Sequence, residues 1–408
     1  MAEALTLTDD AVLKEPFAAY KWLRDNAPVY RDPVTGHYVI SRYEDLETVF
    51  ADVEAFSSSS GMQVQSAYLM DDEAGRILRE QAVPQPDTLL NADPPQHTQF
   101  RALVQGAFHP RRIREMEAYI DAICVELIEK FADNGRFEVL SELAIPLPMY
   151  IIADQLGVPR SDYETFKRWS DSRLMLTNPR LPADLRVDCA KATVELQAYL
   201  MAAAERYRQS PADNILTDIV TGEIDGRPLT DPEMLNIAVT LIVAGNETTT
   251  NTIATGLHLM CTQGLEPQLR EDFSRLPIFI EEVLRLTTVI QGLYRKTTRE
   301  VTLDGVTIPA GAIVMLRIAA GNRDERKFDQ PDLIRLDRKN ANQHLTFGTG
   351  IHYCLGNALA RSELRIAFTN LLTRFRNFRI AAEPGNETWL VHPFARGVTK
   401  LALEFDLV

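Results

Sequence analysis

The chain lacks any apolar run long enough to cross a membrane. None of its 408 residues belongs to a stretch approaching the ~18 consecutive apolar residues that a spanning helix requires. Residues 1–10 also have neither the basic start nor the apolar core of a secretion signal. We therefore expect a cytoplasmic protein with no membrane partner.

The sequence also lacks a surplus of basic residues and any grouping of cysteines. Lysine and arginine total 43 against 57 acidic residues, a net charge of −14, whereas a nucleic-acid-binding face must be basic to displace counterions from phosphate. The four cysteines are far apart and show no CxxC spacing, so neither a zinc knuckle nor a disulfide framework is indicated. We expect no nucleic-acid partner.

What the chain does contain is mostly helical periodicity. Hydrophobic residues make up 45% and charged residues 25% of the chain, as in ordinary globular proteins, and no repeat or low-complexity linker divides it. Strand signals are short and few, at residues 38–41, 301–303 with 306–308, 313–318 and 401–405. We predict a mainly α fold with small β-sheets, forming one large domain over residues 1–408.

One cysteine, Cys354, has surroundings unlike those of the other three. It lies in the segment FGTGIHYCLG, residues 347–356, ahead of a helical pattern that starts at Asn357. A lone cysteine is usually inert core, so a buried cysteine in a tight turn is the alternative interpretation. The glycines, however, let the backbone approach a flat ligand and point amide groups at a sulfur. One cysteine cannot form a zinc site, but it can be the axial ligand of a haem, whose porphyrin supplies four further donors.

A second unusual segment lies within a long helix predicted over residues 231–263. The helix begins with the capping-box spacing of Thr230 and Glu233. At its centre, the segment AGNETT, residues 244–249, places a glycine and adjacent threonines where they disfavour a helix. Such conflicts are expected at functional sites, and here Thr248 offers a hydroxyl and Glu247 a proton relay. A helix kink that only serves packing is the alternative.

These segments together resemble the soluble bacterial branch of the cytochrome P-450 superfamily, over nearly the whole chain. The cysteine loop of that family reads FGxGxHxCxG, and motifs at residues 97–101, 244–249 and 282–285 follow in the family's order. The resemblance implies haem b with Cys354 as the iron ligand, and it assigns Thr248 and Glu247 to catalysis as the alcohol and acid of oxygen activation. The cofactor-binding residues that it implies are His97, Arg101, Arg295, His352, Cys354, Phe347, Gly348, Ala244 and Gly245.

Charged residues have two further roles in this resemblance. The two haem propionates need cationic or donor partners if they are buried, and the family pattern implies His97, Arg101, Arg295 and His352. Glu282 and Arg285 are three apart on a helix and can pair. The resemblance adds Arg338 to form a buried triad that holds the cysteine loop in shape. Near that triad, Glu325 and Ile334 depart from the proline and the aromatic residue that are common in the family.

The substrate pocket implied by the resemblance is mostly apolar. Its residues are Met62, Val64, Leu174, Met175, Thr240, Val243, Ala244, Val289, Ile290, Leu293 and Phe394. We expect a small to medium hydrophobic substrate (terpenoid, sterol, aliphatic or aromatic), which the enzyme hydroxylates or oxidatively dealkylates with O2.

The electrons for this reaction must come from another protein, because the sequence contains neither a Walker loop nor a dinucleotide-binding GxGxxG unit. We expect a ferredoxin or flavodoxin with its reductase. Because small ferredoxins are commonly acidic, this chain needs a locally positive face on which such a carrier can dock. The candidates are Arg111, Arg112, Arg114, Arg361 and Arg365.

Two alternatives of other classes stay open. One is a haem-thiolate protein that binds or senses a ligand without oxidising it. The other is an isomerase or peroxygenase on the same fold. The pair Glu247 and Thr248 favours the monooxygenase, because a sensor needs no proton relay.

Overall fold

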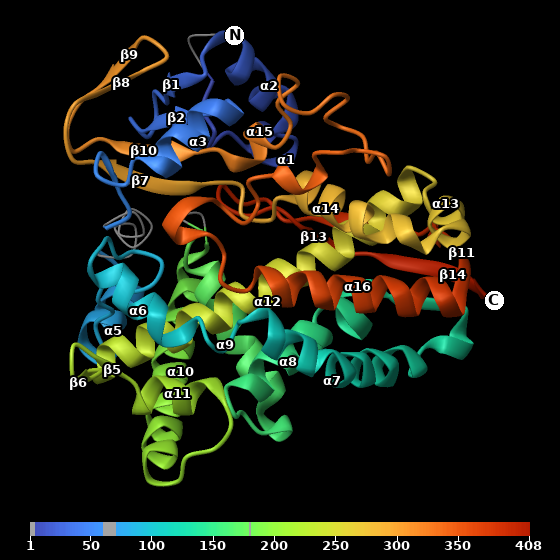
Figure 1. Ribbon diagram of the computed structural model, residues 1–408, viewed down its shortest axis with the longest axis horizontal. Helices are drawn as coiled ribbons and strands as arrows, with labels where there is room; N and C mark the ends of the chain where they lie inside the picture. Colours follow the sequence, from blue (N-terminus) through green and yellow to red (C-terminus); the bar gives the residue numbers. More distant parts are fainter. Residues whose placement is uncertain (1–4, 60–70, 179–180) are drawn as a thin grey trace. The chain divides into compact units, whose positions relative to one another are not determined.

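The structure, a computed structural model, describes residues 5–59, 71–178 and 181–408. Helices predominate and the sheets are small, which confirms the predicted fold class (Figure 1). The chain forms two compact units. The first unit comprises residues 1–57, 113–147 and 248–408, and the second comprises residues 58–112 and 148–247. The assignment of residues 1–408 to a single domain stays a prediction.

The largest sheet of the first unit has five strands in the order β1-β2-β10-β7-β3. Their bounds are Val29–Arg31, Tyr38–Ile40, Ile313–Leu316, Leu293–Thr297 and Phe56–Ser57. Strands β2 and β10 pair in parallel, and the other pairs are antiparallel. The strand predicted at 313–318 is too long, because the chain leaves the sheet after Leu316 and starts helix α15 (Ile318–Gly321).

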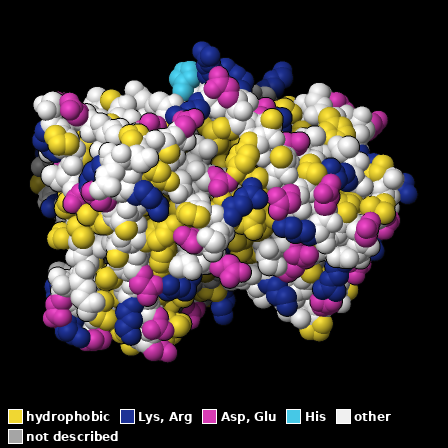
Figure 2. All heavy atoms as spheres, turned by 90° about the horizontal axis from the view of Figure 1, so that it is seen from below, with side chains coloured by type: hydrophobic (Ala, Val, Ile, Leu, Met, Phe, Trp, Pro, Cys, Tyr) yellow, Lys and Arg dark blue, Asp and Glu magenta, His cyan; other side chains and the backbone are white. Residues whose placement is uncertain are grey.

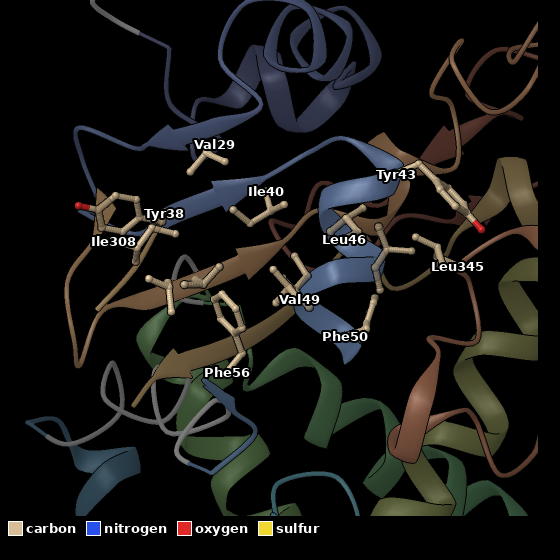
Figure 3. Packing of buried hydrophobic residues seen from close by; sticks show 14 of the residues in the cluster. Val29, Tyr38, Ile40, Tyr43, Leu46, Val49, Phe50, Phe56, Ile308 and Leu345 are labelled. Carbon is tan, nitrogen blue, oxygen red and sulfur yellow. The ribbon is translucent and has the colours of Figure 1, made fainter. Parts of the chain in front are cut away.

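Helix α3 (Tyr43–Ala51) supplies the apolar cover of this sheet. Val49 and Phe50 follow Leu46 by three and four residues, so one helical face carries all three. They pack in one buried cluster with Ile40 of β2 (Figure 3). Leu345 belongs to the same cluster, so the core reaches the segment that leads into the cysteine loop.

The other strands of the first unit form smaller sheets. Strands β11 (Phe375–Ile380), β14 (Ala402–Leu407) and β4 (Arg136–Glu138) form one sheet, in which the predicted strand at 401–405 is displaced by one to two residues. Strand β12 (Thr388–Trp389) pairs with β13 (Val398–Lys400). The predicted hairpin is confirmed as β8 (Val301–Leu303) and β9 (Val306–Ile308). Asp304 and Gly305 both have positive φ at its turn, as a two-residue hairpin turn requires.

Helices form much of the rest of the first unit and most of the second unit (Figure 1). In the first unit the helices, besides α3 and α15, are α1 (Asp10–Lys14), α2 (Phe17–Asn26), α13 (Glu266–Glu271), α14 (Leu276–Thr287) and α16 (Asn357–Arg374). Most of α7 (Pro110–Glu129) also belongs there. The second unit holds α5 (Glu73–Gln81), α6 (Gln96–Val104), most of α8 (Pro146–Gln155), α9 (Tyr163–Met175), α10 (Ala183–Gln209), α11 (Ile215–Thr221) and the hairpin of β5 (Glu223–Ile224) with β6 (Arg227–Pro228).

Helix α12 (Asp231–Thr262) is the predicted long helix, and it runs from the second unit into the first. Its capping box is present, because the Thr230 amide donates to a Glu233 carboxylate oxygen at 2.8 Å. Gly256 lets α12 lie against two neighbouring helices. A Cβ at this position would be 2.7 Å from Phe368 of α16 and 2.9 Å from Val283 of α14.

Glu325, one of the departures from the family pattern, has a local explanation in the fold. Lys21 and Arg24 of α2 contact its carboxylate at 2.7 and 3.1 Å. Burial would raise the pKa of Glu325, but these cations hold it below its usual value. The substitution therefore exchanges a rigid residue for an ion pair between α2 and the segment that follows α15.

The surface carries charges of both signs. Figure 2 shows acidic and basic side chains interspersed with apolar atoms across one face. Within the described parts of the chain, no helix combines the length and apolar character needed to span a bilayer.

Gly256→Ala tests the close helix packing. Because the added methyl group would overlap Phe368 and Val283, we expect a loss of about 1–3 kcal/mol in the free energy of unfolding. Gly106→Ala is the matched control, since a Cβ there meets nothing within 4 Å. Urea unfolding of both variants gives the comparison, and an equal effect of the two substitutions would contradict the packing argument.

Candidate active site

The cysteine loop is a tight backbone turn that leads directly into α16. The Gly348 amide donates to the Leu345 carbonyl at 2.8 Å, and the Cys354 amide donates to the Phe347 carbonyl at 2.8 Å. Gly348 and Gly350 have φ of +66° and +69°, a conformation that glycine adopts without strain. The two predicted glycine positions thus have a clear structural reason.

The environment of Cys354 suits a haem ligand better than that of the other cysteines. Cys124 and Cys189 are buried, and burial raises the pKa of the Cys124 and Cys261 thiols to about 12. Cys354 keeps accessible surface, and no atom lies within 4 Å of a Cβ built on neighbouring Gly356. Among the described residues no cluster of His, Cys, Asp and Glu forms a protein-only metal site. A single accessible cysteine sulfur would fit an iron whose equatorial donors come from a porphyrin.

A buried ion network lies behind this loop. Glu282 and Arg285 of α14 each have 0% exposure, and the Arg285 Nε donates to Glu282 Oε1 at 2.7 Å. Arg338 Nε lies 2.9 Å from Glu282 Oε2. Burial alone would raise the pKa of Glu282, but the two arginines hold it below its usual value. The structure thus brings the three predicted triad residues together.

Arg285 also ties the network to the segment that precedes the loop. Its guanidinium donates to the carbonyls of Asn322, Pro331 and Leu333. Asn322 continues the connection, since its side chain accepts from the Leu345 amide at 2.7 Å and donates to the Thr346 hydroxyl at 2.9 Å. Hydrogen bonds therefore run without interruption from α14 to the residue before Phe347.

A second network, which the sequence analysis missed, holds the loop from α14 and α16. Glu281 receives the Arg361 guanidinium at 2.6 and 3.0 Å and contacts His344 Nε2 at 3.2 Å. Although burial opposes ionisation, these partners lower the pKa of Glu281 to about 2. The Arg361 guanidinium also lies over the Phe347 ring, 4.6 Å from its centroid. Glu281 is adjacent to Glu282 of the predicted triad, but its own partners lie far away in the sequence.

The centre of α12 presents one accessible face. Thr240, Val243, Glu247 and Thr248 keep partial exposure and Ala244 is exposed, whereas Leu241, Ile242, Asn246 and Thr249 are buried. The accessible positions recur every three or four residues, which places them on one side of the helix. The predicted acid and alcohol therefore lie on the same face as three of the predicted pocket residues. Gly245 packs toward α8, where a Cβ would touch Ile152 at 3.4 Å.

Glu363 is a second acid beside α12 that sequence reasoning missed. It lies in α16 at 2% exposure and hydrogen-bonds Thr249 of α12. Burial raises the pKa of Glu363 to about 8, so the carboxyl group holds a proton at neutral pH. The sequence pattern could have indicated Glu363, because it lies on the buried stripe of α16 with Leu359 and Ala367. An acid on an apolar stripe is exceptional.

The four predicted propionate partners divide between the two units. In the second unit, His97 and Arg101 share one face of α6, and burial, with Arg101, lowers the pKa of His97. In the first unit, Arg295 of β7 is 7% exposed and donates to the Tyr294 carbonyl, while His352 lies in the 3₁₀ turn Gly350–His352 of the cysteine loop. Each pair suits a carboxylate.

The predicted pocket residues lie on several elements. Leu174 and Met175 end α9, and Leu293 opens β7. Val289 and Ile290 follow α14, where the Gln291 amide donates to the carbonyl of Phe394 at 2.8 Å. Met62 and Val64 lie outside the described residues.

Comparisons with known proteins point to one family. A family model described as "Cytochrome P450" matches residues 263–393. Cytochrome P450 109 of Bacillus spizizenii is 32% identical over 390 residues, 95% of this chain and 91% of that protein. The cyclomarin C epoxidase CymV of Salinispora arenicola is 35% identical, covering 90% of this chain and 91% of its own. The structure of cytochrome P450 CREJ in complex with (4-ethylphenyl) dihydrogen phosphate superposes with a TM-score of 0.91 at 29% identity, covering 100% of both chains.

The protonation of Glu363 predicts a specific dependence of stability on pH. Its folded-state pKa of about 8 lies above the unfolded value, so the stabilising proton is fully present below the unfolded pKa and is lost as pH rises toward 8. We expect the free energy of unfolding to fall by up to about 1.4 kcal/mol per pH unit in this window. Glu363→Gln should flatten that slope between pH 7 and 8 in urea unfolding, and parallel slopes for the two proteins would show that Glu363 is ionised.

Proposed function

The chain belongs to the cytochrome P450 family of haem b monooxygenases, and from this premise we propose that it hydroxylates or oxidatively dealkylates a small to medium hydrophobic molecule with O2. The observation that carries the proposal is the accessible face of α12, where Glu247 and Thr248 lie beside Ala244. A protein that only senses a ligand needs no such acid and alcohol. A haem with a thiolate ligand supplies the oxygen activation and the insertion of one oxygen atom into the substrate.

The residues of the chain hold the cofactor and handle protons. Cys354 provides the thiolate, and the Glu282 and Glu281 networks keep its loop in position. His97, Arg101, Arg295 and His352 bind the propionates, since buried carboxylates need cationic or donor partners.

Proton delivery falls to residues of α12. The Thr248 hydroxyl and the Glu247 carboxyl pass protons into the site from their shared face of the helix. Glu363 holds a proton next to Thr249, one residue further along α12, and acts as a reserve behind this pair.

The substrate binds mainly through apolar contacts. Val243, Ile290, Leu293 and Phe394 contribute hydrocarbon surface, and Thr240 offers a single hydroxyl, which hydrogen-bonds Asn236 at 3.2 Å. CREJ, whose solved complex holds an ethylphenyl phosphate, supports a substrate with an apolar body, and CymV, by its name an epoxidase, supports the transfer of oxygen to a substrate. Terpenoid, sterol, aliphatic and aromatic bodies are all compatible with these residues.

Electrons arrive from a ferredoxin or flavodoxin in the cytoplasm. The arginines proposed as its docking face are partly compensated, which limits their individual contributions. Arg112 contacts Asp213 at 3.3 Å, and Arg365 contacts Glu117 at 2.6 Å. A positive field at this face therefore depends on several arginines together.

Thr248→Ala tests the role in proton delivery. Substrate binding and consumption of reduced cofactor should persist, but most of the electrons should leave as hydrogen peroxide because the hydroxyl that guides protons is missing. The measurement is product formed per cofactor consumed, and Thr248→Ser is the control that should keep most of the coupling. Unchanged coupling in Thr248→Ala would move proton delivery to another residue.

A salt titration tests the docking face. With a [2Fe–2S] ferredoxin and its reductase, the carrier concentration for half-maximal reduction should rise with ionic strength, because salt screens charges beyond ~8 Å at physiological concentration. The double variant Arg112→Gln, Arg365→Gln should raise the carrier concentration for half-maximal reduction about threefold or more at low salt. Arg379→Gln, which removes an equally paired surface arginine from β11, should have no effect. Reduction that is indifferent to salt and to the double variant would exclude this face.

A further inference from the structure

The last turn of α9 contains an arginine, Arg173. Unlike the other two cations of this helix, it is not compensated by any acidic side chain that the structure describes. Of the three cations of this helix, Lys167 pairs with Asp171 and Arg168 pairs with Glu195. Arg173 forms no ion pair within the described residues. The undescribed segments 60–70 and 179–180 contain no acidic residue, and Glu3 is the only acid outside the described ranges. Arg173 is therefore a positive charge without an evident carboxylate.

The inner part of the Arg173 guanidinium is shielded from water. Its Nε is buried and has no hydrogen-bond partner among the described residues. Burial is the sole cause that lowers the pKa of Arg173, so no nearby acid offsets the free-energy cost of burying its charge. The residue as a whole keeps partial exposure, and any compensating group must therefore approach the outer end of the guanidinium.

The outer end of the Arg173 guanidinium has one neutral hydrogen-bond partner. The Arg173 Nη2 donates to Gln85 Oε1 at 3.1 Å. The backbone around Gln85 is fixed on both sides, because Gln197 accepts from the Val83 amide at 2.8 Å and Asn236 donates to the Pro86 carbonyl. The contact is thus held on a constrained segment, and the amide leaves most of the guanidinium donors available.

Burying an uncompensated cation costs free energy, and a guanidinium recognises carboxylate and phosphate oxygens through paired hydrogen bonds. We propose that Arg173, assisted by Gln85, binds the anionic group, a carboxylate or a phosphate monoester, of an otherwise apolar substrate. This inference rests on the proposed function and on the predicted substrate pocket, which includes the adjacent Leu174 and Met175. It narrows the substrate class to amphiphilic acids.

Ligands that share one apolar body test the proposal with the holoprotein. Dodecanoic acid, monododecyl phosphate and 1-dodecanol are titrated by difference spectroscopy, and lithocholic acid is compared with its alcohol for a steroid body. At least one acid should bind about tenfold or more tightly than its neutral match, as expected for a charge-assisted hydrogen bond. A preference for the carboxylate or for the phosphate identifies the anionic group. If no acid binds more tightly than its match, the proposal is wrong.

Three variants connect the preference to Arg173. Arg173→Gln should remove the preference for the acid and leave the affinity for the neutral ligand unchanged, whereas Arg173→Lys should retain part of it. Arg168→Gln is the matched control on the same helix and should change neither affinity. An acid preference that survives in Arg173→Gln would overturn the assignment.

Stability and spectra separate a binding role from a structural one. Without ligand, Arg173→Gln should unfold at the same or a higher temperature than the wild type, because it removes a charge that no carboxylate compensates. A clear loss of stability would show that Arg173 serves the fold instead. Failure of the proposed function would appear differently, as loss of the thiolate-type carbon monoxide spectrum or of neutral-ligand binding in the unaltered protein.

Discussion

The ion network of Glu282, Arg285 and Arg338 is the constraint on which the rest of the site depends. Two arginines and one carboxylate in the protein interior are costly unless every charge is compensated. Here the carboxylate receives both guanidinium groups, and the arginines use their remaining donors on backbone carbonyls. Those carbonyls belong to an irregular segment without a hydrogen-bonded ladder of its own. The network therefore replaces secondary structure and fixes the path of the chain into the cysteine loop.

The molecule handles buried charge in three ways, and each corresponds to a different task. In the networks of Glu282 and Glu281 the acids stay ionised and bind arginine, which makes them rigid supports. Glu363 is neutral near pH 7 because burial raises its pKa to about 8, and a protonated acid can supply a proton. Arg173 has only the neutral Gln85 as a partner among the described residues, and it has no easy route to neutrality, since a guanidinium keeps its proton. A cation in that state is suited to a ligand.

Locally unfavourable backbone is concentrated around the same site. Thr288, which follows α14, has a φ of 33°, a region that a β-branched residue seldom occupies. Its hydroxyl donates to the Arg285 carbonyl at 2.7 Å and accepts from Asn322 at 2.8 Å. The buried network thus stabilises a conformation that the local sequence disfavours, immediately before the predicted pocket residues Val289 and Ile290. Such strain persists only where surrounding contacts over-determine the backbone.

The sequence alone determined the features that depend on neighbouring residues. The glycines at 348 and 350, the hairpin turn at Asp304 and Gly305, and the capped helix α12 were predictable because backbone sterics and local hydrogen bonds act within a few positions. Tertiary structure decided the rest. Strand β7, with its sequence LYRKT, carries no clear alternation and pairs only because β10 and β3 lie beside it. The partners of Glu281 lie 63 and 80 positions away at His344 and Arg361, and Thr249 meets Glu363 from another helix. Proximity of this kind arises from packing, so the resulting protonation states could not be read from the residues in order.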